Sequence, residues 1–79
     1  MSALKNVNDN AIRDEIARQI KAEMIVKKVA VRKMAIITGI SVSAVMSYRQ
    51  GTADIPATKL ASIAKALGVS CSVLLGKYA

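Results

Sequence analysis

The sequence predicts a small all-α domain of five helices. Apolar residues recur every three or four positions in several stretches, and no stretch shows the sustained period-2 alternation of a half-buried strand. Glycines and capping residues separate the periodic stretches. The chain has 79 residues, which is enough for one small domain. The expected helices cover about 9–28, 31–38, 42–50, 56–67 and 71–76, within a single domain of residues 9–79 that follows a flexible segment of residues 1–8.

The first predicted helix, residues 9–28, is amphipathic. Its apolar stripe recurs at intervals of four residues, which is the spacing of one helix face: Ile12, Ile16, Ile20 and Met24. Asn8 or Asp9 can cap its first turn, and Lys27 and Lys28 suit the negative end of the helix dipole.

The second and third predicted helices, residues 31–38 and 42–50, are short and close together. Gly39 can take the left-handed conformation that ends the second helix. Ser41 is a natural N-cap for the third helix, which stops at Gly51. Two short helices joined by such a turn form a helix-turn-helix, whose second helix enters the major groove of DNA.

The last two predicted helices follow a polar loop. Pro56 lies in the first turn of helix 56–67, where its missing N–H does no harm. The apolar stripe of that helix is Leu60, Ile63, Ala64 and Leu67. Gly68 ends this helix, and Ser70 can cap the short fifth helix. Cys71, at the start of the fifth helix, is expected in the core.

Composition disfavours catalysis and metal binding. The chain has no His, one Cys and five scattered acidic residues, which leaves neither imidazole chemistry nor a thiolate cluster, a disulfide or an acid–base pair. No apolar stretch approaches the roughly 20 residues that span a membrane. We therefore expect a cytoplasmic, non-enzymatic protein with no cofactor, no metal and no membrane partner.

The net charge of +7 points to a polyanionic partner. Nucleic acid is the first candidate and an acidic membrane surface the second. The glycines at 39, 51 and 68 divide the chain into short packed helices, whereas a membrane-surface peptide presents one long basic face. The charge therefore favours nucleic acid.

Several groups of residues together match one family. They are Met34-Ala35, Thr38-Gly39-Ile40-Ser41, Val45, Tyr48-Arg49-Gln50-Gly51, residues 60–70 and Leu74-Leu75. In this order and at these spacings, the chain resembles the lambda-repressor/Cro-type (XRE family) helix-turn-helix regulators of bacteria and phages, over roughly residues 16–76. The resemblance implies a five-helix lambda-repressor-like domain that binds double-stranded DNA.

The resemblance implies that the third helix reads DNA bases. The expected readers are Val42, Ser43 and Ser47, with Ala44 and Met46 nearby. Serine hydroxyls contact any base edge, and valine packs on a thymine methyl, so none of these is a discriminating bidentate reader. Specificity is therefore expected to be modest, or to be helped by DNA shape and dimer spacing. The alternative is that both serines are merely solvated.

The resemblance also implies a set of phosphate contacts. The candidates are Arg32, Lys33, Ser41, Tyr48, Arg49, Gln50, Thr52 and Lys59. Ala30 and Val31 stand where relatives carry a polar cap and a Gln, so the charge at this point must come from Arg32 and Lys33, unless these form a solvated face.

Arg49 has two alternatives: an ion pair with Glu23, or a phosphate contact beside an inward-packed Tyr48, which we favour. Four other cations are expected to contribute a general field only: Arg13, Arg18, Lys21 and Lys65.

Ile36 and Ile37 occupy positions that are usually polar in relatives. They either pack on the long first helix or form a protein–protein surface. Family dimers often use the C-terminal region, so Val73 and Tyr78 are further candidates for a protein contact.

The leading functional hypothesis is a Cro-like or minimal repressor of the bacterial nucleoid. It would bind a near-palindromic operator as a homodimer and block transcription. The alternative is a protein-interaction module of the same fold, an antitoxin or antirepressor partner that uses Ile36 and Ile37.

Overall fold

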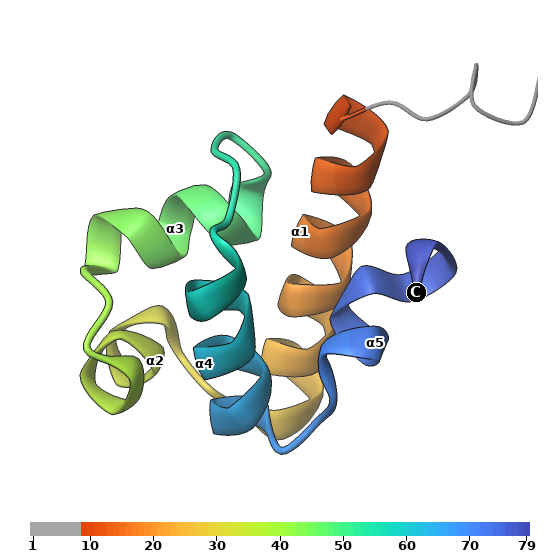
Figure 1. Ribbon diagram of the computed structural model, residues 1–79. Coiled ribbons are helices and arrows are strands. Elements are labelled where there is room, and N and C mark those ends of the chain that lie inside the picture. Colours follow the sequence, from red (N-terminus) through yellow and green to blue (C-terminus); the bar gives the residue numbers. More distant parts are fainter. Residues whose placement is uncertain (1–8) are drawn as a thin grey trace, which may run out of the picture.

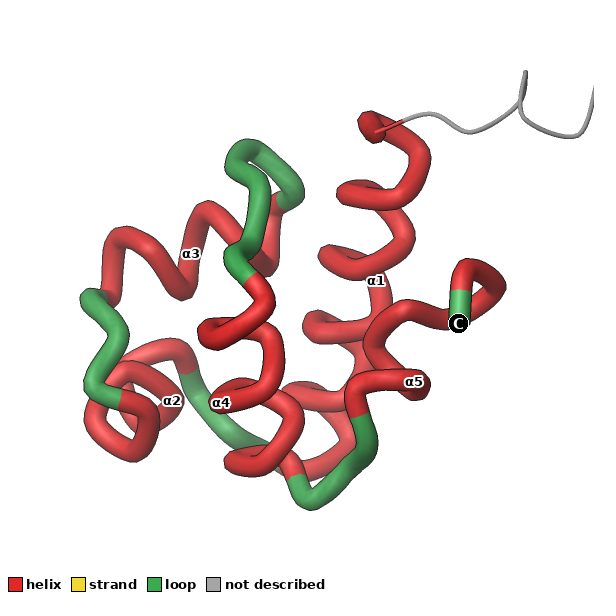
Figure 2. Tube along the Cα trace, in the orientation of Figure 1, coloured by secondary structure: helices red, strands yellow, loops and turns green. Residues whose placement is uncertain are grey.

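The computed structural model describes residues 9–79, and this part of the chain is all-α, as predicted. Its elements are α1 (Asp9–Lys27), α2 (Val31–Thr38), α3 (Val42–Gln50), α4 (Ala57–Leu67), α5 (Cys71–Leu75) and the 3-10 helix η2 (Gly76–Tyr78). The expected flexible segment of residues 1–8 lies outside the described residues. Figure 1 shows α2 and α3 together on one side of the molecule, α1 and α5 on the other, and α4 between them. Loops between these helices are short (Figure 2).

Each helix contributes one fully buried side chain to a shared core. These side chains are Ile20, Met34, Val45, Ile63 and Leu74. Both predicted apolar stripes point into this core, apart from Ile12, which is only partly buried. The half-buried Cys71 packs against the same cluster. Because every helix is anchored at its own buried residue, the core holds α2 and α3 in a defined position relative to α1.

The predicted end of the first helix is wrong by one residue. Lys28 has a left-handed backbone (φ 58°) and lies beyond the helix. The N–H of Val29 donates to the carbonyl of Met24 (2.9 Å), and the N–H of Lys28 donates to the carbonyl of Ile25 (3.1 Å). This pair of hydrogen bonds is the Schellman arrangement, which usually places glycine where Lys28 lies.

Three other predicted helix ends need correction. Pro56 precedes α4 as its N-cap, because its backbone is extended there (ψ 150°) and its carbonyl accepts the first helical hydrogen bond. The side chain of Ser70 makes no capping hydrogen bond to α5. The fifth helix ends at Leu75, one residue early, because Gly76 leaves the α-helical region and begins η2. The cap of α1 at Asn8 lies outside the described residues.

The C-terminal turn is fastened to α1 by the buried side chain of Glu15. Its Oε2 accepts hydrogen bonds from the backbone N–H of Lys77 (3.3 Å) and from Nε2 of Gln19 (3.2 Å). Its Oε1 forms an ion pair with Arg18. A β-carbon on Gly76 would collide with this carboxylate, so the close approach requires glycine. The sequence offered no signal for this contact.

No single helix among residues 9–79 is long and apolar enough to cross a membrane. The bent pair formed by α4 with α5 and η2 reaches the required length and composition, but its apolar residues Ile63, Leu67 and Leu74 are buried in the core.

Candidate nucleic-acid interface

The turn between α2 and α3 is built from local hydrogen bonds. Gly39 is left-handed (φ 74°), and its N–H donates to the carbonyl of Ala35 (2.9 Å). The hydroxyl of Thr38 donates to the carbonyl of Met34 (2.7 Å) and accepts from the N–H of Ile40 (3.2 Å). These bonds hold the two helices at one angle, as the helix-turn-helix prediction requires.

The start of α3 is capped as predicted. Ser41 Oγ accepts a hydrogen bond from the N–H of Ala44 (3.1 Å). The same cap is missing at α2, where Ala30 occupies the N-cap position and makes no side-chain hydrogen bond. The first N–H groups of α2 therefore have no side-chain cap, and Arg32 and Lys33 lie exposed beside them.

The outward face of α3 carries three of the five predicted base readers. Val42, Ser43 and Met46 are exposed. Ala44 is partly buried and packs against the core, so it does not belong to this face. Ala44 lies one turn before Tyr48 on the same side of α3, and both side chains pack against the core. Ser47 is half-buried at the margin of the face.

Tyr48 packs inward, and its surroundings define the loop after α3. The tyrosine ring lies against the core and borders a hollow of about 240 Å³ at the start of α1. Asp54, in the loop, pairs with Arg13 of α1 through an Nη2–Oδ1 distance of 2.6 Å and a hydrogen bond from Nε of 2.7 Å. Arg13 therefore fastens the loop to α1, which is more than the general field expected of it.

The remaining predicted phosphate contacts are accessible. Gln50, Thr52 and Lys59 are all exposed. The hydroxyl of Thr52 donates to the carbonyl of Ser47 (3.4 Å), which orients it at the end of α3. No residue of the loop 51–56 carries a positive charge.

Arg49 does not pair with Glu23. The carboxylate of Glu23 instead accepts from Nζ of Lys27 (2.8 Å), its neighbour one turn along α1. Arg49 is half-buried, and its Nε is buried without a hydrogen-bond partner. The ion-pair alternative is therefore wrong, because the local partner of Glu23 is nearer than the one across the helix crossing.

Cations of α1 converge on Arg49, which the sequence did not indicate. One hollow of about 400 Å³ is lined by Asp14, Ala17, Arg18, Lys21, Arg49 and Gln50. A second, of about 290 Å³, is lined by Met24, Ile25, Lys28, Val29, Ala30, Val31 and Arg49. Arg49 therefore lies between the cations of α1 and the start of α2. The available signal was the spacing of Arg18 and Lys21, which places them on one edge of a helix, with Lys28 just beyond its end.

The two isoleucines of α2 are exposed and do not pack on α1. Ile36 is 82% exposed and Ile37 is 51% exposed. Within residues 9–79, α2 contacts α3 and α4 but not α1, because α1 is occupied by α3, α4 and the C-terminal elements. Ile36 also borders a hollow of about 580 Å³ that reaches Val42. Packing on the first helix is therefore the wrong explanation.

The C-terminal candidates for a protein contact differ in exposure. Val73 is exposed, whereas Tyr78 is half-buried under the Nζ of Lys77, which lies 5.6 Å from the ring centroid. Among residues 9–79 there is no group of three His, Cys, Asp or Glu side chains that could hold a metal ion.

Comparison with known proteins identifies the family. The family model of the Cro/C1-type HTH DNA-binding domain matches residues 19–76, from the middle of α1 to the end of α5. Comparisons with curated proteins and with solved structures gave no match. The matched range contains the whole helix-turn-helix and most of the core, which confirms the resemblance inferred from the sequence. The chain therefore belongs to the family of Cro/C1-type helix-turn-helix DNA-binding domains.

Proposed function

We propose that this DNA-binding protein is a transcriptional repressor that recognises a near-palindromic operator as a homodimer. The observation that carries the proposal is the outward face of α3, where Val42, Ser43 and Met46 are exposed on a helix held by a rigid turn. No acidic residue occurs between positions 31 and 50, so nothing on α2 or α3 repels DNA phosphates.

Dimerisation follows from the small number of base contacts that one α3 can make. Two serine- or valine-type contacts discriminate weakly, and two copies in successive major grooves, roughly 34 Å apart, double the contact set. Bound at a promoter, such a dimer excludes RNA polymerase. The protein acts by binding alone in the bacterial cytoplasm, at the nucleoid, and protein concentration sets its occupancy of the operator.

A selection of binding sites from random duplexes tests this function. We expect an enriched inverted repeat with half-sites about one helical turn apart. Ser43→Ala should change the preferred base at one position of each half-site, whereas the wild-type protein should prefer duplex over single-stranded DNA at physiological salt. No enriched sequence and no duplex preference would overturn the proposal.

The exposure of Ile36 favours a second candidate, a protein-interaction module such as an antirepressor or antitoxin partner. This side chain and Ile37 lie uncovered beside the hollow that reaches Val42. The double substitution Ile36→Asp with Ile37→Lys should abolish binding to a purified partner and leave duplex binding unchanged. Loss of duplex binding with the partner still bound would contradict this candidate.

A further inference from the structure

We propose that one edge of α1 forms a second contact with DNA, a sequence-independent phosphate-binding edge made by Arg18, Lys21, Lys28 and Arg49. We call these four residues the α1 edge. The inference rests on the DNA binding proposed above and adds to it a group of cations outside the helix-turn-helix. Its ligand is the phosphate backbone of the duplex that flanks the groove occupied by α3.

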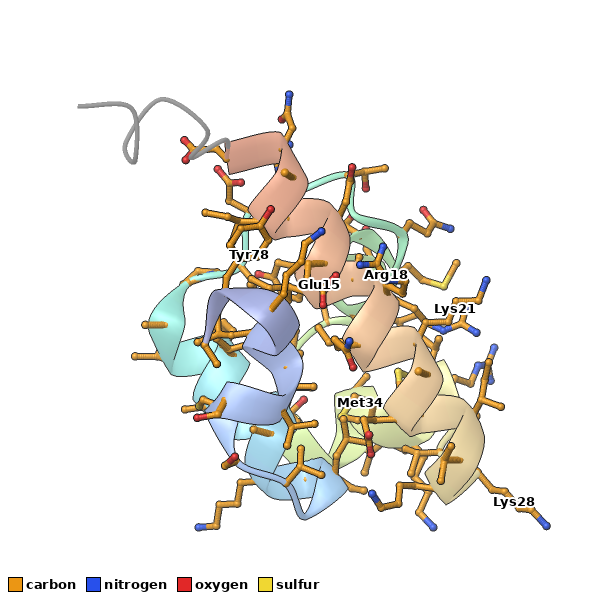
Figure 3. All side chains as sticks on the ribbon, turned by 90° about the vertical axis from the view of Figure 1, so that its right-hand side faces the viewer. Glu15, Arg18, Lys21, Lys28, Met34 and Tyr78 are labelled. Carbon is orange, nitrogen blue, oxygen red and sulfur yellow. The ribbon has the colours of Figure 1, made fainter. Side chains whose placement is uncertain are left out.

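The placement of the cations on α1 supports the first step. Arg18 and Lys21 are three residues apart on α1, which brings them to one side of the helix, and Lys28 follows the end of α1 with a left-handed backbone. Figure 3 shows the three side chains along one margin of α1, on the side away from α4 and α5. At 1.5 Å per residue, α1 extends about 14 Å from Arg18 to its end at Lys27, next to Lys28. Successive phosphates of one DNA strand are spaced about 3.4 Å apart along the helix axis, so a row of this length reaches more than one of them.

The contact between α1 and α3 supports the second step, because it brings Arg49 to the same row. A β-carbon on Gly51 would lie 3.2 Å from Cβ of Ala17, so the end of α3 lies directly against α1. This close approach places Arg49 in both hollows, next to Arg18 and Lys21 in one and next to Lys28 in the other. The α1 edge is therefore continuous with the helix that reads bases.

The unmet hydrogen bonds of these cations point to an anion. The Nε of Arg49 is buried without a partner. Across residues 9–79, Lys21, Lys28 and Arg49 take part in no salt bridge. A buried guanidinium N–H without an acceptor is costly, and the guanidinium of the half-buried Arg49 has further N–H groups that can donate charge-assisted hydrogen bonds to a phosphate. A bound polyanion also relieves the mutual repulsion of four neighbouring cations.

Two acidic residues lie near the edge and do not neutralise it. Glu15 pairs with Arg18, but its carboxylate is buried and also holds the C-terminal turn, while the side chain of Arg18 remains 62% exposed. A guanidinium has five N–H donors, so Arg18 retains donors for a second anion. The carboxylate of Asp14 lines the same hollow as Arg18, Lys21 and Arg49, beside Gly51, and Lys28 lines the other hollow. The net charge at the α1 edge is therefore positive.

The test compares two double variants of equal charge. Lys21→Gln with Lys28→Gln removes two cations of the α1 edge, and Lys65→Gln with Lys77→Gln removes two cations from α4 and η2. Binding of the full chain to a selected duplex and to a random duplex is measured across a range of salt concentrations. Each lost phosphate contact lowers the slope of log K against log salt by about 0.9.

We expect the edge variant to lose about 1.8 from that slope and to bind both duplexes more weakly by the same factor, about tenfold at low salt. The control variant should keep the wild-type slope. Equal slopes in the two variants would overturn the α1 edge and leave operator binding intact. A change in the preferred sequence would also overturn it, because phosphate contacts carry no sequence information.

A third measurement separates this inference from the function on which it rests. If the wild-type protein binds no duplex at all, the proposed function and the α1 edge are both wrong. If it binds a duplex but the edge variant keeps the wild-type slope, only the α1 edge is wrong and the proposal of operator binding through α3 stands. Thermal unfolding of both double variants, which alter exposed lysines only, shows that each remains folded.

Discussion

The two sides of α1 differ in how a partly or fully buried charge is paired. On the side of the C-terminal turn, the buried carboxylate of Glu15 accepts two hydrogen bonds at Oε2 and forms an ion pair with Arg18, although its Oε1 accepts no hydrogen bond. On the side of α3, Arg49 is half-buried and its Nε has no hydrogen-bond partner. A buried charge that has an ion-pair partner holds two segments together, whereas a cation without one keeps its charge available to an external anion. The difference separates a structural contact from a binding edge on the same helix.

The largest expected effect on stability comes from removal of the Glu15 carboxylate, which joins α1 to the C-terminal turn. Glu15→Ala deletes two hydrogen bonds and a buried ion pair, and should lower the free energy of unfolding by about 3 kcal/mol. Urea denaturation measures this loss. The matched control is Glu23→Ala, whose surface pair with Lys27 should contribute no more than about 0.5 kcal/mol. Equal losses in the two variants would show that the Glu15 contact is not special.

Gly76→Ala tests the same contact from the other segment. The alanine methyl meets the carboxylate of Glu15 and must also take a positive φ of 57°, so we expect a loss of about 2 kcal/mol in stability. Gly39→Ala is the control, since its φ is 74° and open space surrounds it; the loss there should be about 1 kcal/mol. In a Glu15→Ala background the collision disappears. The double variant Glu15→Ala with Gly76→Ala should therefore lose less stability than the sum of the losses in the two single variants.

Arg49→Gln tests whether Arg49 contributes to DNA binding instead of to stability. Because Arg49 makes no ion pair among residues 9–79 and its buried Nε has no acceptor, its replacement should leave the free energy of unfolding unchanged or raise it by up to about 1 kcal/mol. Binding to every duplex should fall by about tenfold, which corresponds to about 1.4 kcal/mol. Titration of selected and random duplexes measures this. A large loss of stability with unchanged binding would place Arg49 on the structural side instead.

Lys28→Gly separates stability from binding at a single residue. Lys28 is left-handed in the hydrogen-bond arrangement that ends α1, and Gly68 (φ 71°) ends α4 with the same arrangement. Glycine at position 28 should raise the free energy of unfolding by about 1 kcal/mol, because the left-handed backbone costs lysine about that much. The same variant should bind DNA more weakly. Thermal unfolding and duplex titration of one preparation check both signs.

Much of the fold was predictable because its signals are local. The cap at Ser41, the left-handed Gly39 and the four-residue period of the buried stripes are each decided within one turn of chain. The errors are single residues at helix ends, as at Lys28 and Pro56, where a neighbouring hydrogen bond or a φ value decides the boundary. Three of the five predicted base readers lie on the outward face of α3 for the same local reason.

By itself, the sequence determined the five helices, the helix-turn-helix and the membership of a DNA-binding family. Only the tertiary structure decided which charges meet across the fold. It paired Arg13 with Asp54 and placed Arg49 among the cations of α1, and it exposed Ile36 by turning α2 away from that helix. Helix period and capping depend on neighbours along the chain, whereas ion pairs between separate elements and exposed faces depend on how helices cross, which is set by the packing of the whole core.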